Sequence, residues 1–232
     1  MITAKHEQLT FDLGHRSALG RDDFLIADSN RDAVSWIDLW PEWPAPALVL
    51  YGPAACGKTH LSAVWSAQTQ AVAIDPEELN TGSADELFAR GPHLLIDPVD
   101  HWIGDRAAET TLFHLYNLAK ENKRTLLLTM RMPPVRLSFV IPDLASRLRA
   151  APSVAIHAPD EVLLGAVLVK MFADRQIQIG EDVLNYILPR MERSFAAARD
   201  LVEKADRQAL AEKRAVSVPL VRQILMTQTS AE

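Results

Sequence analysis

The residues best suited to chemistry in this chain lie between Gly52 and Thr59. The run Gly-Pro-Ala-Ala-Cys-Gly-Lys-Thr fits the spacing glycine, four residues, glycine, lysine, then serine or threonine. A polyphosphate needs backbone N–H groups aimed at it from close range, and Gly52 and Gly57 allow the tight turn and keep Cβ atoms away. Lys58 would reach the β- and γ-phosphates, and Thr59 would offer its hydroxyl to Mg²⁺.

The segments on either side of this run provide the structural context that it needs. Residues 47–51 are apolar and branched, which predicts a buried strand, and residues 59–67 predict a helix. The unpaired N–H groups and positive dipole end of that helix would face the phosphates. An ordinary strand–turn–helix connection is the alternative, but it needs no Lys-Thr pair. We therefore predict nucleotide binding by Gly52, Pro53, Ala54, Ala55, Cys56, Gly57, Lys58, Thr59 and His60.

A second candidate is Asp97, which ends the apolar run Leu94–Ile96. In phosphate-loop NTPases an aspartate in this position holds Mg²⁺, directly or through water; the alternative is an aspartate that caps a turn. We predict Thr59 and Asp97 as the metal residues, with ADP or ATP and Mg²⁺ as cofactors. The next residue, Pro98, has no acceptor to activate a water molecule, and Asp100 lies two residues further on. We therefore predict slow or absent ATP hydrolysis by this chain alone.

Composition restricts the function further. The 232 residues are 48% apolar and 23% charged, as in ordinary globular proteins, and the net charge is −6. A protein that grips DNA phosphates by itself is usually basic, so direct sequence-specific DNA binding is disfavoured. The single cysteine, Cys56, allows neither an internal disulfide nor a cysteine metal framework, which suits a cytoplasmic protein. We find no apolar run as long as a membrane span and no signal-peptide core.

The order of the predicted elements indicates an α/β fold. Strands alternate with helices up to residue 158, which predicts a five-stranded parallel P-loop sheet with helices on both faces. Ligands of such sheets bind beyond the carboxyl ends of the strands. After residue 158 only helices are predicted, so we divide the chain into a nucleotide-binding domain (15–158) and a small all-helical lid (159–232). The predicted strands are 47–51, 71–75, 93–97, 124–129 and 154–157; the predicted helices include 30–39 with Ser29 as N-cap, 59–67, 109–122, 142–149, 159–175, 180–191, 194–213 and 218–226.

Two groups of apolar residues have more than one interpretation. In the peptide of residues 1–14, Gln8–Leu13 alternates polar and apolar residues, so Leu9, Phe11 and Leu13 would share one face of an extended strand. That strand could pack on its own domain or dock in an apolar groove of a partner.

Three tryptophans follow, and they could stack on a base, but such residues more often belong to the core. These are Trp36, Trp40 and Trp43.

The motifs in their order resemble a known family. The phosphate loop, the strand ending in Asp97, Leu128-Thr129 followed by Pro133-Pro134, and Leu144–Leu148 precede a helical C-terminal domain. This arrangement resembles the AAA+ module of the bacterial replication initiator DnaA. It is most similar to the shorter DnaA-like regulators of the Hda family, in their alphaproteobacterial form. The resemblance covers nearly the whole chain and leaves no room for the C-terminal helix-turn-helix domain of DnaA.

The resemblance implies two functional sites and two partners. Gln8–Leu13 resembles a clamp-binding hexapeptide: Gln8 would enter a polar site on the β sliding clamp of DNA polymerase III, and Leu9, Phe11 and Leu13 would fill its groove. Arg147 matches an arginine finger that acts in trans in the nucleotide site of a neighbouring subunit; without the resemblance, a solvated helix arginine would be favoured. The implied function is promotion of ATP hydrolysis by DnaA, which prevents re-initiation of replication. A homo-oligomer is also possible.

The chain departs from the family pattern at three positions near the γ-phosphate. Arg131 stands where the family has a polar or acidic residue, Pro98 follows the metal aspartate, and residues 194–198 lack the family's arginine over the nucleotide. These departures favour ADP, or a nucleotide bound weakly as a structural ligand. Two alternatives stay open: an autonomous ATPase of the helicase-loader or clamp-loader type, and a clamp-binding adaptor with a vestigial nucleotide site.

Overall fold

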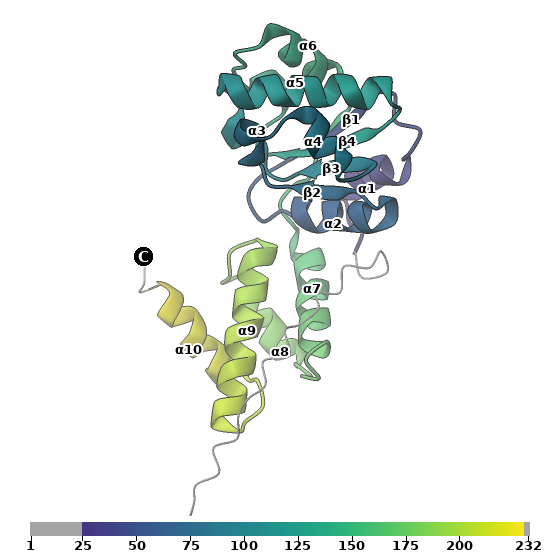
Figure 1. Cartoon of the computed structure of the whole chain (residues 1–232). Helices are drawn as coiled ribbons and strands as arrows, with labels where there is room; N and C mark the ends of the chain where they lie inside the picture. Colours follow the sequence, from purple (N-terminus) through teal and green to yellow (C-terminus); the bar gives the residue numbers. More distant parts are fainter. Residues whose placement is uncertain (1–24, 230–232) are drawn as a thin grey trace, which may run out of the picture.

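The computed structural model describes residues 25–229, and the predicted clamp-binding residues Gln8, Leu9, Phe11 and Leu13 lie outside this range (Figure 1). A five-stranded sheet has the order β2-β3-β4-β1-β5, and every neighbouring pair is parallel. This confirms the predicted parallel sheet, although several strands are shorter than predicted. The strands are β1 (Ala47–Tyr51), β2 (Val72–Ile74), β3 (His93–Ile96), β4 (Thr125–Met130) and β5 (Ser153–Ala155).

Helices cover both faces of the sheet because its strands are apolar on both faces, as parallel strands commonly are. In β4, Leu126 and Leu128 pack into one apolar layer and Leu127 into the other, which is the two-residue period of a strand. The first layer contains α3 (Glu78–Thr81), α4 (Ala84–Ala89), α5 (Arg106–Glu121) and α6 (Pro142–Ala150); the second contains α1 (Arg31–Asp38) and α2 (Lys58–Thr69). Figure 1 shows α5 and α6 on one side and α2 on the other.

The tryptophans belong to the second layer, which confirms the core interpretation. Trp43 stacks on Trp65 with ring centroids 5.6 Å apart, and the Trp40 indole donates a hydrogen bond to the Thr125 hydroxyl. The predicted N-cap of α1 was wrong by one residue, because Asn30 occupies that position. Its side-chain amide accepts from Ala27 N and donates to the Leu25 carbonyl, so it closes the preceding turn instead of capping the helix.

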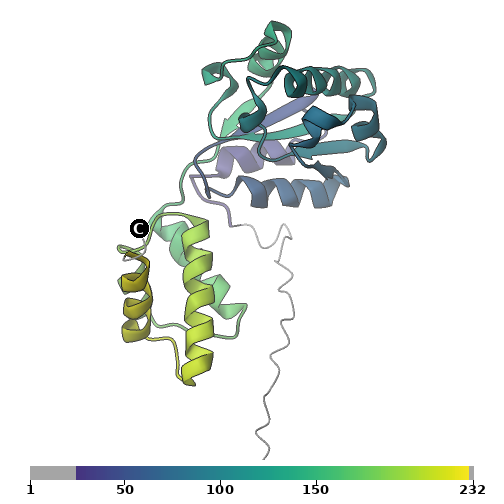
Figure 2. The same ribbon diagram turned by 60° about the vertical axis from the view of Figure 1, so that its left-hand side comes forward.

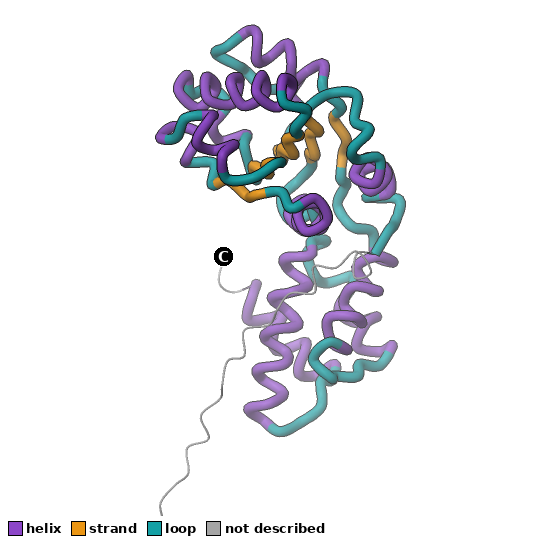
Figure 3. Tube along the Cα trace, turned by 45° about the vertical axis from the view of Figure 1, so that its right-hand side comes forward, coloured by secondary structure: helices purple, strands orange, loops and turns teal. Residues whose placement is uncertain are grey.

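A separate helical unit follows β5 and has its own apolar core. Figures 2 and 3 show its helices beside the sheet unit, which holds all the strands of the described chain. Asp160 and Ser194 cap two of the helices by accepting hydrogen bonds from Leu163 N and Ala197 N. The helices are α7 (Glu161–Ala173), α8 (Glu181–Ile187), α9 (Phe195–Glu212) and α10 (Val218–Thr229). The domain division at residues 158/159 stays a prediction; it falls in the segment between β5 and α7.

Between residues 25 and 229 no helix is both long and apolar enough to cross a bilayer.

Candidate nucleotide-binding site

The phosphate loop leaves β1 at Tyr51 and enters α2 at Lys58, as predicted. Gly52 donates its N–H to the Met130 carbonyl of the neighbouring strand, and a Cβ atom at Gly52 would lie 2.1 Å from the Ile156 carbonyl oxygen. Gly57 precedes α2 with a φ of +105°, a conformation that other residues rarely adopt. Glycine is therefore required at both positions: for space at Gly52 and for backbone conformation at Gly57.

The Lys58 ammonium is fixed inside the loop. Its Nζ donates to the carbonyl oxygens of Gly52 and Pro53, both at 2.8 Å, and the side chain is only 9% exposed. Cys56 is also buried, and burial raises the pKa of its thiol although the Lys58 ammonium opposes this shift. The thiol is therefore neutral near pH 7 and is no nucleophile. The Thr59 side chain, in contrast, is exposed at the start of α2.

Asp97 lies at the same edge of the sheet as the loop. It accepts a short hydrogen bond from the Thr129 hydroxyl at the carboxyl end of β4. Strand β4 lies between β3 and β1, so Asp97 and Gly52 are separated by two strand spacings, about 10 Å. A phosphate on the loop and a metal ion near Asp97 would therefore lie over the carboxyl end of β4, between the loop and the carboxylate.

The residues at this edge fit the predicted cofactors. Magnesium is usually held by one or two carboxylates together with substrate phosphates and waters. Thr59 and Asp97 could provide the protein ligands, and the loop could hold the polyphosphate. Within residues 25–229 no cluster of three or more His, Cys, Asp or Glu side chains could hold a metal without such a substrate. Bound Mg²⁺ would neutralise phosphate charge at this edge.

The carboxylate nearest to Asp97 in the sequence is already engaged. Asp100 accepts a hydrogen bond from the Arg131 backbone N–H at 3.0 Å through one oxygen, and its other oxygen is buried without a hydrogen-bond partner. Pro98 is exposed and offers no acceptor in its side chain. The Asp100 carboxylate therefore ties the segment after β3 to the segment after β4.

Sequence reasoning placed Thr129 with Gly52 and Asp97 at the carboxyl ends of the predicted strands, where ligands of such sheets bind. It missed one residue of this site, Phe195. Phe195 begins α9 of the helical unit, and its N–H donates to the Ala55 carbonyl at 3.2 Å. No local pattern signals that contact, since it joins distant parts of the chain. Arg193, one of the two arginines flanking residues 194–198, pairs with Glu161 of α7.

Arg147 lies on the opposite face of the sheet from Lys58. Its guanidinium carbon is 4.4 Å from the Phe113 ring centroid and 5.6 Å from that of Tyr116, both on α5. The side chain is half-buried, and its Nη1 is buried without a hydrogen-bond partner. The sheet thus separates Arg147 from the phosphate loop of its own chain. The Arg147 guanidinium lies against the Phe113 and Tyr116 rings, and it forms no ion pair with any carboxylate of residues 25–229.

Glu109 holds the segment that leads into the Arg147 helix. This fully buried α5 residue accepts hydrogen bonds from the backbone N–H groups of Gly104, Val140 and Ile141 at 2.7–3.0 Å. Because Ile141 is the N-cap of α6, the carboxylate fixes the start of that helix against α5. No local sequence pattern indicates this role, since Glu109 is only the first residue of a predicted helix.

Replacing Glu109 with alanine is expected to lower the free energy of unfolding by about 3 kcal/mol, because three backbone N–H donors lose a charged acceptor that is fully buried. Urea denaturation followed by circular dichroism measures the change. Glu121→Ala, on the exposed end of the same helix, is the matched control and should change stability by less than about 0.5 kcal/mol. Equal effects of the two substitutions would refute the anchoring role.

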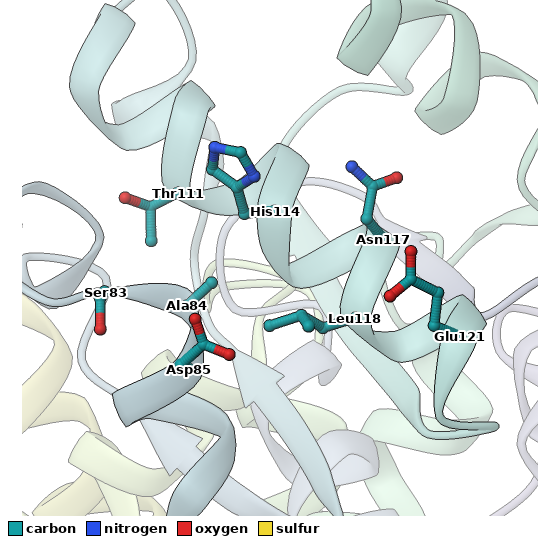
Figure 4. Close-up of a pocket in the computed structure, with 8 residues that line it drawn as sticks. All are labelled: Ser83, Ala84, Asp85, Thr111, His114, Asn117, Leu118 and Glu121. Atoms are coloured by element: carbon teal, nitrogen blue, oxygen red, sulfur yellow. The ribbon is translucent and has the colours of Figure 1, made fainter.

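A pocket of about 560 Å³ lies elsewhere, between the start of α4 and α5 (Figure 4). It is lined by Ser83, Ala84, Asp85, Thr111, His114, Asn117, Leu118 and Glu121. None of these residues belongs to the phosphate loop or to the predicted metal site, so this pocket is distinct from the candidate nucleotide site.

Comparison with known proteins agrees with this geometry. Residues 165–225, about a quarter of the chain, match the family described as Hda, lid domain. Domain III of the Thermotoga maritima replication initiation protein DnaA is 20% identical with a TM-score of 0.79, and the match covers 96% of this chain and 98% of that one. Residues 165–225 are thus similar to the Hda lid domain, and the chain as a whole has the fold of DnaA domain III.

Two further structures show the same AAA+ fold at lower identity. AMPPCP-bound DnaA from Aquifex aeolicus is 18% identical with a TM-score of 0.65, covering 78% of this chain and 63% of that chain. The Holliday junction branch migration motor RuvB of Thermotoga maritima is 15% identical with a TM-score of 0.68, covering 90% and 71%. Phe195, which contacts the phosphate loop, lies within the residues that match the Hda lid domain.

Proposed function

We propose that this protein is a DnaA-related regulator of replication initiation. It binds ADP or ATP with Mg²⁺ at residues 52–60 and Asp97, binds the β sliding clamp through Gln8–Leu13, and promotes ATP hydrolysis by DnaA through Arg147. The observation that carries the proposal is the combination of an Hda-type lid with an ordered phosphate loop in one chain. A cytoplasmic location follows from this role.

The placement of Arg147 supports action on a second molecule. An arginine finger stabilises charge on a transferring phosphoryl group. Here the sheet lies between Arg147 and Lys58, so the finger would serve a phosphate held by another subunit. DnaA is the proposed recipient; a second copy of this chain would present the same kind of phosphate loop, which makes a homo-oligomer an additional possibility.

Tethering to the clamp would raise the local concentration of this regulator near DnaA on DNA. Linked binding events gain through effective concentration without any new contact. The chain has a net charge of −6, so it would reach DNA through the clamp instead of through its own phosphate contacts. In the sequence, residues 14–24 separate the peptide Gln8–Leu13 from the first described residue, Leu25.

Replacing Gln8 and Leu13 together with alanine is expected to abolish retention by the sliding clamp in a pull-down, because the polar and apolar anchors of the peptide are both removed. Thr10→Ala is the matched control: Thr10 is not among the proposed anchor residues Gln8, Leu9, Phe11 and Leu13, so this variant should be retained like the wild type. Undiminished retention of the double variant would exclude the peptide as the clamp-binding element.

The second candidate function is that of an adaptor with a vestigial nucleotide site. Two contacts near the expected position of the γ-phosphate support it. Arg131 uses its backbone N–H to hold Asp100, and Arg193 is paired with Glu161. A regulator of the proposed kind should stimulate DnaA better with ADP bound than without nucleotide. An adaptor would show the same stimulation and the same clamp binding in both states.

A further inference from the structure

The start of α9 touches the phosphate loop at two points, both made by Phe195. Its backbone N–H donates to the Ala55 carbonyl at 3.2 Å. Its ring carbons lie 3.2 and 3.5 Å from the position that a Cβ atom of Gly57 would take. Figure 2 shows one end of α9 directed at the unit that carries the loop. The lid thus contacts the part of the loop that would surround the phosphates.

The hydrogen bond from Phe195 to the Ala55 carbonyl also fixes the direction of the Cys56 N–H. A trans peptide group is planar, so the Ala55 carbonyl and the Cys56 N–H point in opposite directions. With the carbonyl turned to the lid, the Cys56 N–H must point away from the lid. A phosphate loop binds anions through just such N–H groups turned to its concave side. Ala55 also has a φ of +56°, a conformation that a non-glycine residue keeps only when its surroundings hold it.

We propose that Phe195 is a positioning residue of the nucleotide site. Its N–H sets the Ala55–Cys56 peptide plane, so the loop is preorganised for a nucleoside polyphosphate only while the lid is docked. The inference rests on the nucleotide binding proposed above and gives it a regulatory consequence. By thermodynamic reciprocity, a nucleotide on the loop strengthens lid docking by the same factor by which docking strengthens nucleotide binding.

The lid is built to present this N–H group. The first N–H groups of a helix have no acceptor within the helix. The Phe195 N–H can therefore donate to an acceptor outside it. The Ser194 hydroxyl caps the helix through Ala197 N, and Ala198 and Leu201 anchor α9 in the lid core. The Arg193–Glu161 pair ties the start of α9 to the start of α7. A displacement of the lid would therefore carry Phe195 with it.

Two substitutions at this position separate the N–H group from the ring. Phe195→Pro removes both, whereas Phe195→Ala removes the ring and keeps the N–H. Proline is well tolerated at the first residue of a helix. Ser194, with φ −142° and ψ 150°, already has the extended conformation that the residue before proline requires. Both variants should therefore keep the wild-type helix content by circular dichroism, and only the proline variant loses the hydrogen bond.

The first measurement is the affinity for fluorescently labelled ADP in the full chain. We expect Phe195→Pro to bind about three- to tenfold more weakly than Phe195→Ala, the range for one hydrogen bond. Equal affinities of the two variants would overturn the positioning role, even if both bound less tightly than the wild type, because the ring alone would then account for the loss.

The second measurement needs no nucleotide. Amide hydrogen exchange should show protection of the Phe195 N–H in the wild type, and faster exchange of loop amides 56–58 in Phe195→Pro than in Phe195→Ala. If the wild type binds no ADP but the loop amides differ in this way, the nucleotide site fails and the coupling of lid to loop stands. If the wild type binds no ADP and the two variants also exchange alike, both proposals fail.

Discussion

Arg147→Ala is expected to lower the stimulation of ATP hydrolysis by DnaA about 10³-fold or more, while clamp binding and ADP binding stay at wild-type levels. The reason is charge: an arginine finger neutralises the phosphoryl group in the transition state, and alanine cannot. Binding should be spared because the sheet separates Arg147 from its own phosphate loop. The measurement is ADP formation on ATP-loaded DnaA in the presence of clamp and DNA.

Arg149→Ala is the matched control for this experiment. Arg149 lies on the same helix, but it is exposed and its guanidinium donates to the Leu137 carbonyl. This variant should stimulate DnaA nearly as well as the wild type. If Arg149→Ala removed stimulation and Arg147→Ala preserved it, the finger would be assigned to the wrong residue of α6. Full activity of both variants would show that neither arginine acts in trans.

Lys58→Met is expected to weaken ADP binding roughly 10- to 150-fold, the range for losing a hydrogen bond from a charged group. Methionine keeps an unbranched side chain of similar length in the buried position, so the substitution mainly removes the ammonium. The carbonyls of Gly52 and Pro53 would also lose their donor, which loosens the loop that surrounds the phosphates. Isothermal titration calorimetry with ADP and Mg²⁺ measures the affinity.

Lys120→Met tests whether the lost charge alone explains such a result. Lys120 is exposed near the end of α5, on the opposite face of the sheet from the loop, and its substitution changes the net charge by the same amount. ADP affinity should then stay within about twofold of the wild type, because exposed charges are screened over such distances. An equal, small effect of both substitutions would mean that Lys58 does not contact the phosphates.

The sequence determined the elements whose signal lies within a short window. The apolar run 47–51, the two glycines and the Lys58-Thr59 pair together predict a strand, a turn and a helix start, and the structure has β1 and α2 there. The alternation of strands and helices predicts the parallel sheet, because each of these elements also has its signal within a short window. Errors occur at the ends: β5 stops at Ala155, two residues earlier than predicted, because strand ends depend on pairing with neighbours more than on residue type.

Only the tertiary structure decided which distant residues meet. It placed Thr129 against Asp97, Arg147 on Phe113 and Phe195 at the phosphate loop. It also turned Glu109, one polar residue among many in the sequence, into the buried anchor of α6. Local patterns record the period of a helix or strand and the conformational needs of a turn. Contacts between segments far apart depend on how whole layers pack, and no short stretch of sequence contains that information.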